Sequence, residues 1–270
     1  MYPILTKLGP VTIYSFGTFI VIGFLVASWY VRRRSIRELG VDGERVFNFC
    51  FVLLFLALFG ARMLYVLLHY EEHVQKPMSA FMIWNGGLAF FGGLAMCLIA
   101  IGWYLPRHKE LGGWSLVDVL VLGGCLAIFV GRWASFLSGE NYGDKSPDLA
   151  WGVRFPPGAE SQIPRSWRGI PLHPTQLYHS LHGLVLFGLL VWYLRRKPAP
   201  GRALGLFLML YAIGRGIIEI WRADDAARGM VIPDYLSIPQ LICIPVFFLG
   251  LGIFLTRHKG EEDPGIPASA

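Results

Sequence analysis

Long runs of apolar residues, separated by mostly short polar connections, dominate this sequence. An α-helix needs about 20 predominantly apolar residues to cross the hydrocarbon core of a bilayer. Seven runs come close to that length, namely Ile13–Val31, Val46–His69, Gly87–Leu105, Leu116–Leu137, Gln176–Leu194, Ala203–Arg222 and Leu236–Leu255. The sequence therefore predicts an all-α membrane protein with about seven transmembrane helices.

The composition excludes an ordinary water-soluble domain. Hydrophobic residues make up 54% of the 270 residues and charged residues only 16%, which is too little polar surface for a soluble core of this size. We expect one transmembrane helical domain over residues 1–257, followed by a polar tail over residues 258–270. The first apolar run is not preceded by a basic segment or followed by a small-residue cleavage site, so we expect a retained anchor.

The distribution of lysine and arginine predicts the orientation in the membrane. Basic residues concentrate in the connections after the first, third and fifth runs and in the tail. Such clusters stay in the cytoplasm, so the N-terminus is expected outside and the C-terminus in the cytoplasm. The net charge of +6 is then explained by topology and by contact with anionic membrane lipids, and nucleic-acid binding is not predicted. The segment Gly139–Thr175, with six prolines, becomes an ordered outer loop between the fourth and fifth helices.

No cofactor or metal is expected. The cysteines lie inside apolar runs and form no CxxC pair, so they are interpreted as small buried hydrophobic side chains: Cys50, Cys97, Cys125 and Cys243. The sequence also has no glycine loop that leads to a helical lysine, and no cluster of metal-ligating residues.

Three arginines interrupt the apolar runs: Arg62, Arg132 and Arg215. An arginine near the middle of a membrane helix costs about 3 kcal/mol even on the gentler insertion scales, so each needs a compensating partner or a ligand. With the orientation above, all three lie in the outer half of the bilayer. We therefore expect the functional site there.

The sixth run carries the richest set of polar residues. Tyr211, Arg215, Glu219 and Arg222 are spaced four, four and three residues apart, which puts them on one face of a helix. One interpretation is a self-contained Arg–Glu–Arg ladder that fixes the helix in the bundle. The other is that Glu219 holds one guanidinium while Arg215 stays free to bind an anion through two hydrogen bonds.

The fourth run ends in GRWASFLSGENYG, from Gly131 to Gly143, where an arginine is followed by small residues and a glutamate. Small residues allow another chain or a ligand to approach closely. One interpretation is that Arg132 and Arg215 form a two-arginine clamp for a phosphate. An ion pair between Arg132 and Glu140 is an equally open alternative.

Two further segments lie at the same level. HPTQLY, from His173 to Tyr178, begins the fifth helix, and helix capping explains Thr175 but neither His173 nor Gln176. GGLAFFGG, residues 86–93, opens the third helix with paired glycines. Paired glycines suit a close backbone approach to a ligand, but glycine-mediated helix packing would look the same.

Together these segments resemble the bacterial prolipoprotein diacylglyceryl transferases. The match rests on the order and spacing, over nearly the whole chain, of Tyr14, GGLAFFGG, the GR-to-GE run, HPTQLY and the polar set of the sixth run. The resemblance implies a transferase of the bacterial inner membrane with its site on the periplasmic side. Its partners would be phosphatidylglycerol and the lipobox cysteine of a prolipoprotein signal peptide, which yield a thioether and glycerol phosphate.

The resemblance also implies roles for individual residues. Arg132 and Arg215 match the phosphate-binding arginines of the family. Tyr211 and Glu140 also match family positions and are expected to be catalytic with them. His173 is a candidate base for a separate reason, since it is the only imidazole near the predicted site. Substrate binding is implied for Tyr14, Arg132, Ser135, Gly143, Gln176, Arg215, Glu219 and Arg222.

The sequence departs from the family pattern at two positions. Phe91 occupies the place of a histidine proposed as general base, and Ser135 that of an asparagine. Because phenylalanine cannot accept a proton, two functions stay open: a working transferase, and a relative that binds anionic phospholipid or lipoprotein precursor without transfer. A transporter or channel is disfavoured, since the arginines mark one leaflet only. The remaining histidines are interpreted as hydrogen-bonded or solvated: His69, His73, His108, His179, His182 and His258.

Overall fold

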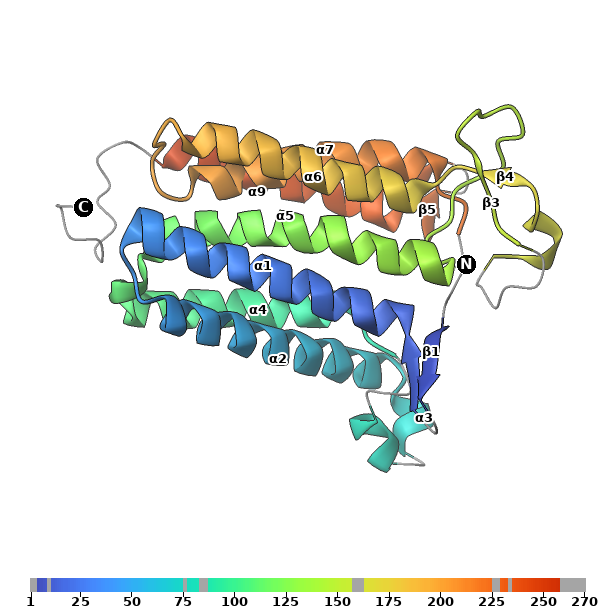
Figure 1. Ribbon diagram of the computed structural model, residues 1–270, viewed down its shortest axis with the longest axis horizontal. Coiled ribbons are helices and arrows are strands. Elements are labelled where there is room, and N and C mark those ends of the chain that lie inside the picture. Colours follow the sequence, from blue (N-terminus) through green and yellow to red (C-terminus); the bar gives the residue numbers. More distant parts are fainter. Residues whose placement is uncertain are drawn as a thin grey trace. The chain divides into compact units, whose positions relative to one another are not determined.

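Seven long helices make up most of the protein (Figure 1). The computed structural model describes residues 4–8, 11–74, 77–82, 87–156, 163–224, 229–232 and 235–257. The helices long and apolar enough to cross a membrane are α1 (Ser15–Leu39), α2 (Gly43–Leu68), α4 (Phe90–Tyr104), α5 (Gly113–Ser138), α6 (Thr175–Leu194), α7 (Arg202–Ile218) and α9 (Ile238–Thr256), with the 3-10 turns after α4 and α7 counted in their spans. The prediction of an all-α membrane protein with seven spans is confirmed; its orientation stays a prediction.

Short elements occupy the connections and were not predicted from the sequence. Three antiparallel strand pairs form, namely β1 (Ile4–Leu8) with β2 (Val11–Tyr14), β3 (Val153–Arg154) with β4 (Pro171–Leu172), and β5 (Met230–Ile232) with β6 (Leu236–Ser237). A short helix α3 (Tyr70–Val74) follows α2. The 3-10 turns are Pro77–Phe81, Leu105–Arg107, Lys109–Leu111, Arg165–Trp167 and Glu219–Trp221.

The contacts group the chain into two compact units. Unit 1 comprises the described residues within Met1–Tyr30 and Val117–Glu261, and so contains α6, α7, α9, most of α1 and nearly all of α5. Unit 2 comprises the described residues within Val31–Leu116, and so contains α2, α3 and α4. That residues 1–257 act as one domain stays a prediction.

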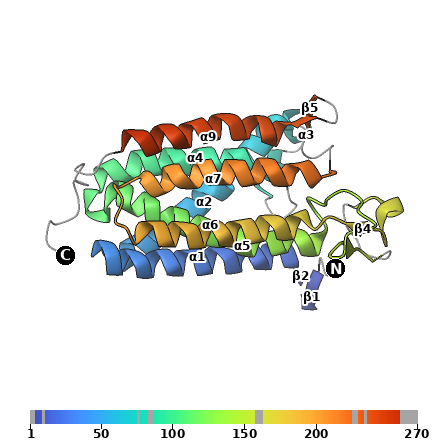
Figure 2. The ribbon, with the colours of Figure 1, turned by 90° about the horizontal axis from the view of Figure 1, so that it is seen from above.

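In unit 1, helices α6, α7 and α9 run side by side (Figures 1 and 2). Gly205 of α7 and Gly250 of α9 allow the closest approach, because a Cβ on Gly205 would lie 2.8 Å from the carbonyl oxygen of Gly250. Side chains from α5, α6 and α7 form a buried core, namely Leu122, Cys125, Leu186, Leu190 and Ala203. Cys125 is a free thiol within that core, as the sequence predicted for a small hydrophobic side chain.

In unit 2, α2 and α4 pack along each other (Figure 1). A side chain at Gly92 or Gly93 would collide with the backbone of α2, at Gly60 and Ala57 respectively. These glycines of the GGLAFFGG segment therefore serve helix packing. Gly86 of that segment lies outside the described residues.

Arg62, the intramembrane arginine of α2, binds backbone carbonyls of unit 2. Its guanidinium donates to the carbonyl oxygens of Ala80 at 2.8 Å, Gly87 at 2.9 Å and Ser79 at 2.5 Å. The residue is buried, and three accepting oxygens offset the desolvation of its charge. Arg62 therefore ties α2 to the segments before α4.

The long segment between α5 and α6 has a small core of its own, within unit 1. Tyr142, Phe155, Ile163 and Leu172 are buried together, and β3 pairs with β4 beside them. Within its described residues, 139–156 and 163–175, the segment thus has a regular structure, and that it is an outer loop stays a prediction. This small core holds the segment that connects α5 to α6, and both ends of that segment border the candidate site.

Candidate functional site

Three segments of unit 1 meet where α5 and α7 end and α6 begins. Gly143, after α5, forms a β-bridge with Arg222, after α7. The neighbouring Asp144 donates its N–H to the carbonyl oxygen of Trp221 at 2.8 Å, and its own carbonyl accepts from the N–H of His173 at 2.9 Å. The GR-to-GE run, HPTQLY and the end of the sixth span are thus joined through their backbones.

Gly143 lies at the tightest point of this junction. A Cβ there would collide with the carbonyl oxygen of His173 and lie 2.9 Å from the methyl group of Thr175. We expect Gly143→Ala to destabilise the protein by about 1–3 kcal/mol, the usual cost of overpacking. Thermal unfolding in detergent checks this, with Gly188→Ala on α6 as control, because a Cβ at Gly188 meets no atom within 4 Å. Equal stability of the two variants would contradict the close contact.

The predicted Arg–Glu–Arg ladder is present. One oxygen of Glu219, Oε2, lies 3.1 Å from Nη2 of Arg215 and 3.3 Å from Nη1 of Arg222. Glu219 is fully buried, so its charge is compensated by two guanidiniums and not by water. The expectation that one helix carries all four polar residues was wrong: α7 ends at Ile218, a 3-10 turn follows, and Arg222 is extended.

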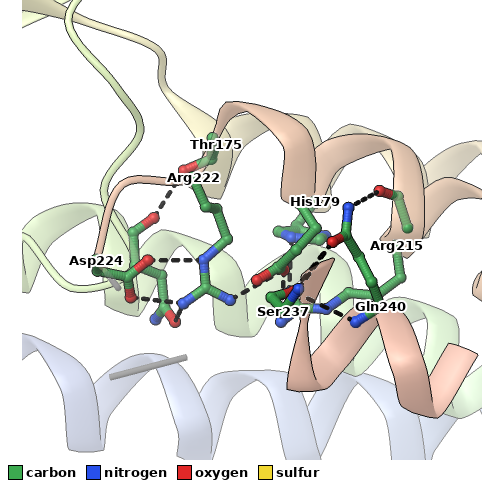
Figure 3. A network of polar contacts seen from close by, with 10 residues as sticks. Thr175, His179, Arg215, Arg222, Asp224, Ser237 and Gln240 are labelled. Atoms are coloured by element: carbon green, nitrogen blue, oxygen red, sulfur yellow. Dashed lines mark hydrogen bonds and ion pairs between the residues drawn. The ribbon is translucent and has the colours of Figure 1, made fainter. Parts of the chain in front are cut away.

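Arg222 leaves the helical path because its other partners lie in loops. Its guanidinium binds Asp224 through Nε at 2.9 Å and through Nη2, and Nη2 also donates to the side-chain oxygen of Asn141 at 3.1 Å (Figure 3). Burial disfavours the charge of Arg222, but hydrogen bonds to Asp224 and the carboxylate of Glu219 raise the pKa of Arg222 above its ordinary value. Arg222 is therefore a permanently charged structural centre of the junction.

Arg215 is not free, contrary to one of the two interpretations of the sequence. Besides Glu219, it donates from Nη1 to Nε2 of His179 at 2.8 Å (Figure 3). The side chain of Arg215 is only 14% exposed. Both terminal nitrogens thus have a protein partner, and the remaining N–H groups of Arg215 have directions set by these two bonds.

Arg132, Arg215 and Arg222, with the carboxylates of Glu219 and Asp224, form a charged cluster. Arg132 differs from the other two arginines. It lies on α5, within electrostatic range of Tyr211, Arg215, Glu219 and Arg222. Among the residues that the structure describes, none accepts a hydrogen bond from its guanidinium or forms an ion pair with it. The alternative of an Arg132–Glu140 ion pair is not found among them either. Arg132 therefore presents a partly buried cation and five N–H donors without a described protein acceptor.

The first turns of α6 face the site with polar side chains. Thr175 donates to the carbonyl oxygen of Asn141 and Gln176 to that of Glu140, each at 2.7 Å. His179 binds Arg215, and Ser180 donates to the carbonyl oxygen of Phe129 on α5 at 2.7 Å. The amide nitrogen of Gln176 holds the chain after α5, while its Oε1 is buried without a hydrogen-bond partner among the described residues. That Gln176 contacts substrate stays a prediction.

Glu140 and His173 are two titratable groups of the junction that lie outside the spans. Burial raises the pKa of Glu140 above its ordinary value. Burial lowers the pKa of His173, an effect that the nearby Asp144 opposes, and Nδ1 of His173 lies 3.1 Å from the hydroxyl of Tyr178. Partial burial therefore strengthens Glu140 as a base and weakens His173.

Three further residues were predicted for the site: Tyr211, Ser135 and Tyr14. The ring of Tyr211 stacks on Phe207 and His182, and Tyr211 lies within electrostatic range of Arg132. Ser135 is buried on α5, and its carbonyl accepts the N–H of Glu140, which lies beyond the helix end at Ser138, at 3.0 Å. Tyr14 is 58% exposed at the end of β2, and no hydrogen bond or ion pair within the described ranges connects its side chain to the cluster.

The sequence interpretation missed three residues of the site: Asn141, His179 and Asp224. His179 had a usable signal, because it follows Thr175 by four and Gln176 by three residues and so shares their helical face. Asn141 and Asp224 had none, since their side chains reach Arg222 from loops.

The cluster is suited to bind an anion. Three guanidiniums, of Arg132, Arg215 and Arg222, face two carboxylates, of Glu219 and Asp224, which leaves one positive charge in excess. In a low-dielectric environment such an excess strongly favours a negatively charged ligand. Guanidinium forks match the geometry of phosphate oxygens. The arrangement therefore fits a phosphate group held mainly by Arg132.

Comparison with known proteins identifies the family of this chain. The chain matches the family model of prolipoprotein diacylglyceryl transferase over residues 3–256. It is 32% identical over 262 residues to a phosphatidylglycerol–prolipoprotein diacylglyceryl transferase of Geobacter sulfurreducens, covering 95% of this chain and 96% of the relative. It is 34% identical over 278 residues to the protein of that name from Rhodospirillum centenum, covering 99% and 96%. With its intramembrane cationic cluster and these matches, the chain belongs to the prolipoprotein diacylglyceryl transferase family.

Proposed function

We propose that this protein transfers the diacylglyceryl group of phosphatidylglycerol to the lipobox cysteine of a prolipoprotein signal peptide. The reaction takes place at the periplasmic side of the bacterial inner membrane. The names of the family relatives support both substrates. The observation that carries the proposal is Arg132, a partly buried guanidinium within electrostatic range of Arg215 that has no acceptor among the described residues.

The chemistry requires a cationic site. The cysteine sulfur attacks the glycerol carbon of the diacylglyceryl group, a C–S bond forms, and the C–O bond to the phosphate breaks with its electron pair remaining on oxygen. The thiol proton passes to a base. The phosphate gains negative charge as glycerol phosphate departs, and Arg132 and Arg215 stabilise that charge in the transition state.

Release of glycerol phosphate tests the proposal. The purified protein is given phosphatidylglycerol and a lipobox peptide, and glycerol phosphate and the mass of the peptide are measured together. We expect glycerol phosphate and lipid-modified peptide to form in equal amounts. Neither should form with a peptide in which serine replaces the cysteine. Lipid binding without release, or release only after Phe91→His, would instead support the non-transferring alternative.

Glu140 is the proton acceptor that the local chemistry favours. Its carboxylate is half-buried, its pKa is raised by burial, and no described residue forms an ion pair with it. A raised carboxyl pKa brings a general base closer to the working pH. His173, the base suggested by the sequence, has its pKa lowered by burial and its Nδ1 engaged with Tyr178.

We expect Glu140→Gln to lower kcat/KM by about 10²–10⁴, the usual contribution of general acid–base catalysis. The acidic limb of the pH profile, which arises as the carboxylate is protonated at falling pH, should disappear in this variant. The parallel variant His173→Gln should keep that limb. Loss of the limb in His173→Gln alone would assign the proton to His173. The measurement is kcat/KM against pH for both variants.

A further inference from the structure

We propose that His179 is a positioning residue that orients the guanidinium of Arg215 toward the lipid phosphate; this inference rests on the proposed function. Its hydrogen bond to Arg215 gives His179 a contact that goes beyond helix packing. The residue is 2% exposed, and its Nε2 lies 2.8 Å from Nη1 of Arg215 (Figure 3). The bond is therefore shielded from water, where hydrogen bonds are strongest.

The bond fixes the protonation of the histidine. Arginine has donors only, so Nε2 of His179 accepts from Nη1 of Arg215 and the ring proton resides on Nδ1. A neutral imidazole in this tautomer binds the guanidinium without cancelling its charge. The positive charge of Arg215 thus remains available to an anion.

Glu219 alone does not fix Arg215. The oxygen that accepts from Nη2 of Arg215 is shared with Arg222, at 3.1 and 3.3 Å. One shared contact leaves the planar guanidinium able to rotate about it. A second acceptor at Nη1 determines the plane of the group and hence the directions of its remaining N–H bonds.

The position of His179 is itself set by the junction. Thr175 and Gln176, on the same face of α6, bind the carbonyl oxygens of Asn141 and Glu140. The first turn of α6 therefore links the chain around Glu140 to Arg215. A shift of α6 would move the guanidinium and the candidate base together.

Three variants test the inference. His179→Leu removes the acceptor, His179→Gln supplies an amide oxygen at similar reach, and Ser180→Ala removes a hydrogen bond from the same helix to α5. Each is assayed for kcat and KM, and for thermal stabilisation by glycerol phosphate, which reports anion binding without turnover. If His179→Leu does not fold, His179→Asn, whose amide is too short, replaces it.

We expect a roughly 100-fold lower kcat for His179→Leu, the scale of a misplaced catalytic group, with an unchanged KM for the peptide. His179→Gln and Ser180→Ala should keep most of the activity, and glycerol phosphate should stabilise both but not His179→Leu. Equal losses in the Gln and Leu variants, or no loss in either, would overturn the inference. If the native protein transfers nothing yet glycerol phosphate binding follows this pattern, the proposed reaction fails while the positioning role stands.

Discussion

Arg132→Gln should abolish most of the transfer while leaving the fold intact. Removing one preorganised donor to a developing negative charge typically lowers the rate by about 10²–10³. The fold should survive because no described residue depends on Arg132 as a hydrogen-bond donor, and because the variant removes one of three neighbouring positive charges. Glycerol phosphate release and thermal unfolding, measured on the same preparation, check both parts.

Two companion variants sharpen this prediction. Arg132→Lys keeps the charge but loses the planar fork, so we expect partial activity. Arg45→Gln, which removes a largely exposed arginine paired with Asp42 and Glu110, should keep full activity. Transfer at the native rate in Arg132→Gln would contradict the phosphate role. A strong fall in its thermal stability would show that Arg132 has a structural task.

Glu219→Ala should have the largest effect on stability. Glu219 is fully buried and its carboxylate serves both Arg215 and Arg222. Removing one member of a buried ion pair leaves an uncompensated charge and costs about 3–5 kcal/mol. The transition in a chemical-denaturation series, followed in detergent, should shift accordingly.

The matched control is Glu110→Gln, which removes a carboxylate that is about half exposed in its ion pair with Arg45. Such surface pairs contribute only about 0–1 kcal/mol. Adding Arg132→Gln to Glu219→Ala should recover part of the lost stability, because it removes a positive charge within range of the same carboxylate. Similar shifts in Glu219→Ala and Glu110→Gln would refute the central place of Glu219.

The sequence determined the fold class and most of the residues of the site. Hydrophobic length is read directly along the chain, and it predicted all seven spans to within a few residues except at the C-terminal end of α1. The cost of an arginine in hydrocarbon singled out Arg62, Arg132 and Arg215. Helical spacing also predicted the contact between Arg215 and Glu219, because residues four apart meet on one face.

The tertiary structure decided what each arginine does. All three are arginines within an apolar helix, so their local sequences do not distinguish them. Their surroundings differ, because Arg62 binds backbone carbonyls of a connection and Arg215 binds His179 of another helix. Arg132 has no acceptor among the described residues. Likewise Arg222, which lies beyond the end of α7, binds Asn141 of the segment after α5 as well as Asp224, two residues further along the chain. Periodicity along one helix contains no information about groups that other segments bring to it, so only the packing showed that Arg215 has His179 as a partner while Arg132 has no described acceptor.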